Sequence, residues 1–143
     1  MIDTTLPVRL GERFAREHRF TPGQVRAFSL TAGDDNPLHM DAAKAAVSPY
    51  GALIVSGTHT SALLLGLTAS HFSKRTTVVG RTFTVTFRRA VRADATVSIE
   101  WEVVGVTPRA GKTGAVVALQ GTLRNMLDGE ICVAASGEVV VGL

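Results

Sequence analysis

A carboxylate and an imidazole lie close together in the polar segment Gly33–His39 (GDDNPLH). Asp34 and His39 are the two side chains, and they flank Asn36-Pro37. Because a proline disfavours helical backbone at the residue before it, the segment is predicted to be an irregular loop that folds back and brings both side chains to one point. A carboxylate beside an imidazole, with room for a water between them, makes an acid–base pair. The alternative is that Asp34 only caps a turn and that His39 is a surface residue.

A second candidate site is Ser56-Gly57, which precedes a strongly apolar segment. At the beginning of a helix the free backbone N–H groups are donors, and the helix dipole adds partial positive charge. Gly57 would let a ligand carbonyl come close, so this place is a candidate oxyanion hole. The alternative is that Ser56 is an ordinary N-cap and that Gly57 only permits the turn. Arg81 follows the apolar segment and could meet a phosphate, although a solvated surface position is the simpler interpretation.

Residues 58–71 are predicted to form one central helix that the rest of the chain wraps. The leucines at 63, 64, 65 and 67 fall on several faces of such a helix. A helix that is apolar nearly all round has to be buried all round. Its length would be roughly 20 Å, which is too short to span a bilayer. Gly66 in mid-helix costs about 1 kcal/mol relative to alanine, so close packing is predicted there.

The elements before the central helix are predicted from local signals. Residues 12–20 alternate and could begin as a short edge strand. A helix should begin after Thr21, which forms a capping box with Gln24, and should end at Gly33. A short helical turn is expected over residues 41–47. The first of these helices should present one face to the core, made of Val25, Phe28, Ser29 and Ala32.

Four alternating, valine-rich segments complete the chain, at residues 76–87, 96–106, 114–126 and 130–141. They predict an antiparallel meander of four long strands, with Asp128-Gly129 as the sharpest turn signal. A chain in which helices precede a run of strands has an α+β pattern. The simplest arrangement that buries the central helix is a curved sheet wrapped around it. One sheet of this size leaves an edge strand open, which favours a dimer.

Composition bounds the function. The chain has 143 residues with 45% hydrophobic and 19% charged content, which predicts one globular domain over residues 1–143 and excludes disorder. The net charge of +3 fits a phosphorylated ligand and equally fits simple solubility. Nucleic acid is disfavoured because no long basic run is interleaved with aromatic residues.

The N-terminal sequence lacks a signal-peptide pattern, so a cytoplasmic protein is expected. The single cysteine, Cys132, is predicted to be a buried small hydrophobe.

Two segments in this order, residues 33–39 and residues 51–57 (GALIVSG), resemble the MaoC-like hydratase family. This family comprises (R)-specific enoyl-CoA hydratases and 3-hydroxyacyl-CoA dehydratases. The Gly-Asp-x-Asn-Pro-Leu-His signature is specific, and the order of elements matches over nearly the whole chain. The resemblance implies a hot-dog fold, in which an antiparallel sheet wraps a long helix, usually in a homodimer or a dimer-based oligomer. It implies a hydro-lyase of fatty acid metabolism that acts on an acyl-CoA thioester. No metal and no cofactor apart from the CoA of the substrate is expected.

The resemblance also implies roles for single residues. Asp34 and His39 would hold one water and deliver hydroxide to Cβ and a proton to Cα of a trans-2-enoyl-CoA, or catalyse the reverse dehydration. Gly57 would offer its N–H to the thioester oxygen. The resemblance implies that Asn36 shapes the loop. Apart from the resemblance, we predict that Asn36, Ser56 and Arg81 contribute to substrate binding.

The sequence also departs from the family pattern, and other functions stay open. Many members have histidine at the position of Ser56, and proline is common at the position of Ala90. A hot-dog acyl-CoA thioesterase and a non-catalytic subunit of a heteromeric dehydratase are the alternatives.

Overall fold

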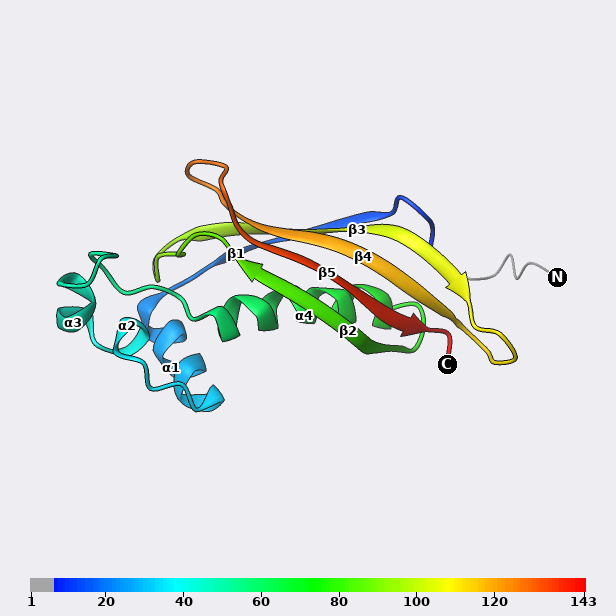
Figure 1. Cartoon of the computed structure of the whole chain (residues 1–143), viewed down its shortest axis with the longest axis horizontal. Helices are drawn as coiled ribbons and strands as arrows, with labels where there is room; N and C mark the ends of the chain where they lie inside the picture. The colour runs from blue at the N-terminus through cyan, green and yellow to red at the C-terminus, as the bar shows by residue number, and fades with distance from the viewer. Residues whose placement is uncertain (1–6) are drawn as a thin grey trace.

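A five-stranded antiparallel sheet curves over one long helix in the computed structural model, which describes residues 7–143 (Figure 1). Three shorter helices gather at one end of the sheet, beside the beginning of the long helix (Figure 1). This arrangement confirms the predicted α+β hot-dog fold. In chain order the elements are β1 (Arg13–Arg19), α1 (Pro22–Ala32), α2 (Pro37–Met40), α3 (Ala42–Ala46), α4 (Gly57–Ser73), β2 (Val78–Phe87), β3 (Thr96–Pro108), β4 (Ala115–Asn125) and β5 (Ile131–Val141).

The strand order is β1-β3-β4-β5-β2, so the predicted meander of four strands is wrong at its first step. β3, β4 and β5 do pair in sequence, but β2 pairs with β5. The edge of β3 is already occupied by β1. The connection from β2 to β3 crosses the end of the sheet, where Val55 donates its N–H to Val91 O at 2.7 Å and Ala93 donates to Leu53 O at 3.0 Å. β2 therefore lies at the opposite edge of the sheet from β1.

The predicted boundaries of α1 are confirmed. Thr21 caps the helix, since its Oγ1 accepts the Gln24 N–H at 3.3 Å, and Gly33 ends it with a left-handed φ of 77°. The predicted core face is wrong in part, because Ala32 is exposed. α1 packs against α2 and α4, with Val25 and Ser29 buried, and its last turn is exposed to solvent. Gly33 then turns the chain into the loop that carries Asp34.

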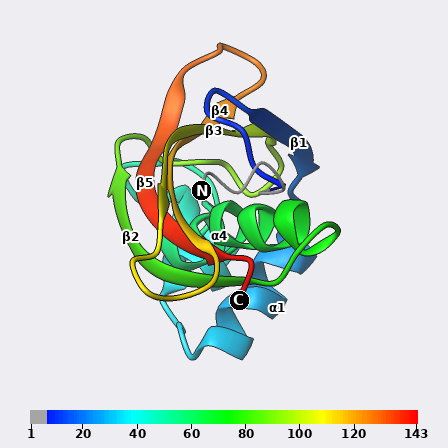
Figure 2. The ribbon, with the colours of Figure 1, turned by 90° about the vertical axis from the view of Figure 1, so that its right-hand side faces the viewer.

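α4 packs one face against the concave side of the sheet and leaves another face open (Figure 2). Leu64, Leu67 and Phe72 are buried, but a stripe of small residues is exposed along the helix, at Thr58, Ala62, Gly66, Ala69 and Ser73. A Cβ at Gly66 would meet no atom of residues 7–143 within 4 Å. The predictions that the helix is buried on all sides and that Gly66 is closely packed are therefore wrong for a single chain. The five strands wrap only part of the helix.

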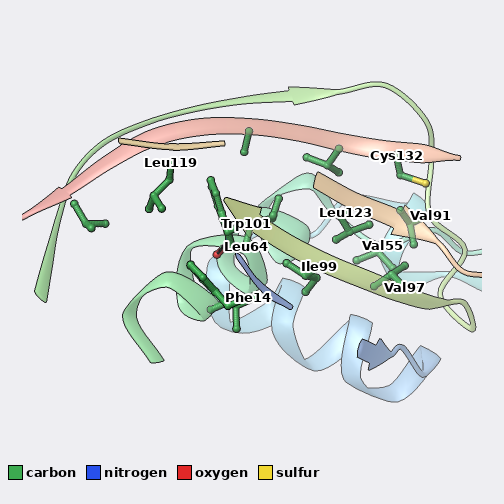
Figure 3. Packing of buried hydrophobic residues seen from close by; sticks show 14 of the residues in the cluster. Phe14, Val55, Leu64, Val91, Val97, Ile99, Trp101, Leu119, Leu123 and Cys132 are labelled. Carbon is green, nitrogen blue, oxygen red and sulfur yellow. Dashed lines mark hydrogen bonds between the residues drawn. The ribbon is translucent and has the colours of Figure 1, made fainter. Parts of the chain in front are cut away.

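The core joins α4 to the middle of the sheet through Trp101 on β3 (Figure 3). Its side chain is fully buried, and its indole N–H donates to Leu64 O at 2.9 Å. Gly121 lies opposite Trp101 on β4, and a Cβ there would approach the indole Cδ2 to 2.5 Å. The ring thus occupies the space that a side chain at 121 would need. Cys132 is also buried in this core, as predicted.

Gly121→Ala is expected to lower the free energy of unfolding by about 1–3 kcal/mol, because the added methyl overpacks a rigid aromatic contact. Gly23→Ala is the matched control, since a Cβ at this position of α1 would meet no atom within 4 Å in the part of the chain that the structure describes. Urea denaturation of the two variants and the parent protein measures the difference. Equal midpoints for the two variants would contradict the packing described for Trp101.

The far end of α4 is attached to the sheet by an ion-pair cluster. Glu12, whose side chain is 8% exposed, accepts hydrogen bonds at Oε2 from Arg75 at 2.6 Å and from His71 at 2.5 Å. Burial raises the pKa of Glu12, but these two hydrogen bonds outweigh it and bring the pKa down to about 2. His71 also stacks on Phe14 of β1, with ring centroids 3.8 Å apart. None of the helices between residues 7 and 143 is both long and apolar enough to cross a membrane.

Candidate active site

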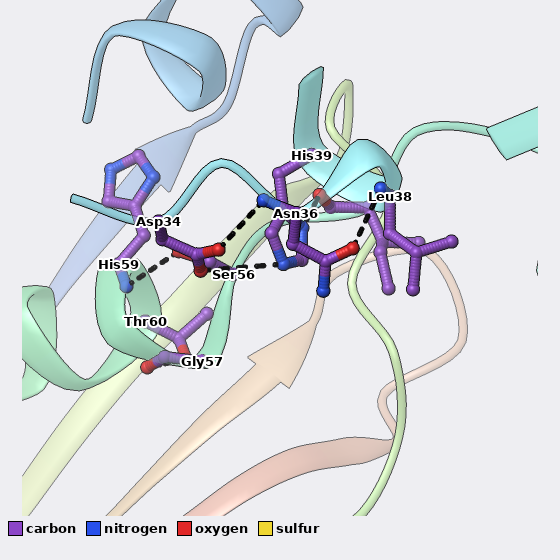
Figure 4. Close-up of polar contacts among 9 residues, drawn as sticks. Asp34, Asn36, Leu38, His39, Ser56, Gly57, His59 and Thr60 are labelled. Atoms are coloured by element: carbon purple, nitrogen blue, oxygen red, sulfur yellow. Dashed lines mark hydrogen bonds and ion pairs between the residues drawn. The ribbon is translucent and has the colours of Figure 1, made fainter. Parts of the chain in front are cut away.

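The loop after α1 directs one oxygen of Asp34 toward His39 (Figure 4). The Asp34 N–H donates to Ser29 O at 2.8 Å, which continues the termination of α1. Its Oδ1 accepts the Asn36 N–H at 3.1 Å in an Asx turn. Oδ2 is the oxygen that faces His39. The carboxylate is thus oriented by its own loop, and its side chain is 30% exposed.

His39 lies in the short helix α2, which Asn36 caps through a hydrogen bond from the Leu38 N–H to Asn36 Oδ1 at 3.1 Å. The imidazole is 8% exposed, and its Nδ1 lies 2.8 Å from Ile54 O. Because a carbonyl oxygen only accepts, Nδ1 carries the proton of the neutral ring and Nε2 has a free lone pair. The Ile54 N–H in turn donates to Leu38 O at 3.1 Å, which fixes this backbone segment against α2.

Asp34 Oδ2 and His39 Nε2 are 3.8 Å apart. This is too long for a direct hydrogen bond but suits one water that contacts both atoms. The structure therefore brings the two side chains together, as predicted. The prediction of an irregular loop as far as His39 is wrong in part, because Pro37 begins the helix α2, which carries His39. A basic nitrogen and a carboxylate that share one water can activate that water and exchange protons with it.

The beginning of α4 presents a backbone donor near this pair. Ser56 is the N-cap, 1% exposed, and its Oγ accepts the His59 N–H at 3.1 Å. Gly57 is the first helical residue, so its own N–H has no acceptor one turn earlier in the helix. A Cβ at Gly57 would meet the Phe87 ring at 2.8 Å. Glycine at 57 thus lets the aromatic ring lie close to the backbone at the helix end.

A cavity of about 400 Å³ joins His39 to Gly57. Of the described residues that line it, none is acidic, and Asp34 lies beside His39 rather than in the wall itself. The cavity has an apolar part and a part that carries two arginines. The remaining lining residues are Tyr50, Ile54, Val55, Thr60, Phe87, Arg88, Arg89, Ala90, Val91 and Val133.

The MaoC-like domain family matches the chain over residues 7–125, which is most of its length. The chain belongs to the MaoC-like domain family. The matched range includes α1, the loop with Asp34 and His39, and all of α4. No curated protein sequence matches the chain.

Solved structures share the fold of this MaoC-like domain. An (R)-hydratase from A. caviae involved in PHA biosynthesis is 25% identical, with a TM-score of 0.82 over 93% of this chain and 96% of that one. A MaoC-like dehydratase from Rhodospirillum rubrum is 26% identical, with a TM-score of 0.81 over 94% and 93%. The R-hydratase PhaJ1 from Pseudomonas aeruginosa, at 22% identity, has a TM-score of 0.84 over 94% and 83%. The last of these shows the fold alone.

Three residues assigned to substrate binding lie outside the cavity wall of this MaoC-like domain. Asn36 and Ser56 are N-caps, and their side-chain oxygens accept backbone N–H groups. Arg81 lies in a separate hollow of about 360 Å³ together with Arg109 and Lys112. The cavity instead contains Phe87 and Tyr50, which the sequence analysis missed, and the arginine pair 88–89. Within the described residues, no three His, Cys, Asp or Glu side chains gather closely enough to hold a metal ion.

His59 joins α1 to the first turn of α4. Its ring stacks on Phe28 with centroids 4.2 Å apart and planes 3° from parallel, and it meets Phe20 edge-on at 5.1 Å. The side chain is buried, and its Nδ1 has no hydrogen-bond partner among residues 7–143. Burial lowers the pKa of His59, and the nearby His18 lowers it further. This contact fixes α1, and thereby the loop that follows it, against the helix that carries Gly57.

The domain is expected to lose stability as the pH falls below about 6.5, the ordinary pKa of histidine. Burial lowers the pKa values of both His18 and His59 in the folded state. The unfolded chain therefore binds more protons than the folded chain just below that pH, so the free energy of unfolding decreases with acidification. Urea denaturation at pH 7.5 and pH 5.5 measures the change. His59→Phe should make the difference between the two pH values smaller, and an unchanged difference would contradict the assignment to this residue.

Proposed function

We propose that the chain catalyses the reversible hydration of a trans-2-enoyl-CoA to a 3-hydroxyacyl-CoA. The observation that carries the proposal is the 3.8 Å separation of Asp34 Oδ2 and His39 Nε2, beside a cavity that also reaches Gly57. Membership of the MaoC-like domain family and the likeness to an (R)-hydratase support the same class of reaction.

The reaction begins with a water held between Asp34 and His39. His39 Nε2 is the basic atom, because Nδ1 donates its proton to Ile54 O. It takes a proton from the water as the oxygen attacks C3 of the enoyl thioester, and the electrons of the C2–C3 double bond move toward the thioester carbonyl. The resulting enolate oxygen accepts the Gly57 N–H, where the positive end of the helix dipole stabilises negative charge. The proton that the Asp34–His39 pair took from the water is then delivered to C2, which regenerates the neutral imidazole, and dehydration follows the same steps in reverse.

An assay with crotonyl-CoA and longer or branched trans-2-enoyl-CoA substrates tests the proposal. Hydration removes the conjugated double bond, so the absorbance of the enoyl thioester decreases. Chiral analysis of the 3-hydroxyacyl product tests the (R) configuration that the family resemblance implies. Absence of hydration across the substrate panel, with a folded protein, would refute the proposal.

The same experiment separates the two alternatives. A thioesterase would use the Gly57 N–H to polarise the thioester carbonyl and would release free CoA, which a thiol reagent detects. A non-catalytic subunit would give neither product. The Asp34–His39 pair favours hydration, because attack on C3 needs both a base for water and an acid for C2.

We also propose that the active species is a homodimer. β2 is an open edge of the sheet, and Val79 and Phe87 on it are both more than half exposed. The uncovered face of α4 is made of small residues, so another surface can approach closely. A second copy that pairs along β2 would cover the open edge. Light scattering coupled to gel filtration measures the mass of the active species.

A further inference from the structure

A second hollow, of about 500 Å³, adjoins the cavity at His39 and Gly57. Arg88 and Arg89 line both spaces, and Arg124 lines the second one. We propose that Arg88, Arg89 and Arg124 bind the phosphate of the thiol carrier to which the acyl group is attached. This inference rests on the proposed function, because it assigns the carrier end of the same substrate. The shared chemistry is a phosphate joined to pantetheine, in CoA or on an acyl carrier protein.

The backbone under these arginines is fixed. The N–H groups of Arg88 and Arg89 both donate to Cys132 O on β5, at 2.8 and 3.1 Å. Arg124 Nη1 donates to Gly129 O at 3.0 Å, across the turn between β4 and β5. A guanidinium carries five N–H donors, so most donors of Arg124 stay available to a ligand. The anchored main chain holds the three cations around one hollow.

The charge balance at this hollow favours an anion. Among the described residues that line it, Glu130 is the one acidic residue, against three arginines. Arg89 Nε lies 3.7 Å from Glu130 Oε2, and both side chains are more than half exposed. Exposed pairs of this kind are weak, so a phosphate can compete for Arg89. Arginine also matches phosphate geometry, since it offers two parallel N–H donors to two oxygens.

The order of the chain places this charge where the carrier should leave the active site. Phe87 lies against Gly57, and the two arginines follow it directly. A thioester bound at the Gly57 N–H would have its acyl chain among the apolar walls, which include Val55 and Val133. Its pantetheine arm would pass Phe87 and end at the arginines. One cavity and its adjoining hollow thus separate the apolar end of the substrate from its charged end.

The test compares substrates that differ only in the phosphate. For crotonyl-CoA, Arg88→Ala combined with Arg89→Ala, and separately Arg124→Ala, should raise KM about tenfold or more with kcat unchanged, because each charged hydrogen bond to phosphate contributes to binding. For crotonyl-pantetheine, which has no phosphate, KM should not change. CoA binding measured by calorimetry should weaken in parallel, and this readout requires no turnover.

Arg109→Ala is the matched control. Arg109 also braces a hairpin, through a hydrogen bond from Nη1 to Thr113 O at 3.2 Å, but it lies in the hollow that contains Arg81. The inference is overturned if Arg109→Ala raises KM while the variants at Arg88, Arg89 and Arg124 do not. It is also overturned if the variants at these three arginines bind CoA as tightly as the parent protein. If crotonyl-CoA is not hydrated by the parent protein while CoA binding depends on the arginines, the proposed reaction fails and the phosphate site stands.

The carrier is identified by a second substrate pair. A crotonyl group on the phosphopantetheine of an acyl carrier protein is compared with crotonyl-CoA in the same variants. An equal loss with both substrates assigns the arginines to the phosphate next to pantetheine. A loss confined to crotonyl-CoA assigns them to its other phosphates, and a loss confined to the carrier protein identifies that protein as the physiological carrier. A loss with neither substrate contradicts the proposal.

Discussion

Asp34→Asn and His39→Ala should each lower kcat for enoyl-CoA hydration by about two to four powers of ten, which is the range for removal of a general acid or base. Asparagine keeps the shape of the Asx turn but loses the carboxylate charge that faces His39. Alanine removes the imidazole of residue 39 and with it Nε2, the nitrogen proposed to act as the base. Initial rates with crotonyl-CoA measure both effects.

Matched variants separate chemistry from folding. His39→Ala also deletes the buried donor to Ile54 O, and an unsatisfied buried carbonyl costs about 1–3 kcal/mol of stability. His39→Asn can place an amide N–H where Nδ1 donates to Ile54 O and still lacks Nε2, so it should be as inactive as His39→Ala but more stable. Asp35→Asn changes the adjacent exposed carboxylate and should leave the rate unchanged. Rates within about threefold of the parent for both Asp34→Asn and His39→Asn would contradict the mechanism.

Local signals predicted the elements well, because they depend on neighbours in sequence. Thr21 caps α1 as predicted, and Ser56 caps α4, which the sequence left open as the alternative to a role in binding. A hydroxyl can accept an N–H only two or three residues further along the chain, so both caps depend on local sequence. The closeness of Asp34 and His39 is also a local result, because Pro37 and two short turns fix the path between them. These parts of the site follow from the loop sequence itself.

The pairing of strands that lie far apart in the sequence was harder to predict. The alternation in residues 78–87 predicts a strand but does not say whether β5 or β3 is its neighbour, and the answer depends on β1 occupying the edge of β3. Likewise, the apolar composition of α4 does not show how far five strands wrap it. Small residues such as Ala62 and Gly66 count as apolar in a pattern, yet they remain exposed in one chain.

The charged part of the site shows the same limit. Arg81 and Arg88 belong to one continuous segment, and both could meet a phosphate by residue type alone. An extended strand advances about 3.3 Å per residue, so a position six residues before Phe87 lies roughly 20 Å away from it. Only the contact between Phe87 and Gly57 selects the arginines next to Phe87 rather than Arg81. That contact joins two elements thirty residues apart and has no local signal.

Gly57→Pro is expected to lower kcat by about two to three powers of ten relative to Gly57→Ala, when both are made in a Phe87→Ala background. Proline removes the N–H proposed to stabilise the enolate oxygen, and alanine keeps it. The first position of a helix tolerates proline, because its N–H has no partner within the helix. Ser56 already has φ −68° and ψ 149°, a conformation that a following proline favours.

The Phe87→Ala background removes the aromatic ring that any Cβ at position 57 would meet at 2.8 Å. The clash of the Cβ with the ring is then absent from both variants, and they differ at the backbone nitrogen, where proline has Cδ in place of the N–H. Thermal unfolding of the two double variants checks that α4 is intact in both. The rates should differ in kcat more than in KM, because the hydrogen bond strengthens as charge develops on the thioester oxygen. Equal kcat values in two folded variants would exclude the Gly57 N–H as the oxyanion donor. The role of the Asp34–His39 pair does not depend on this result and is tested by its own variants.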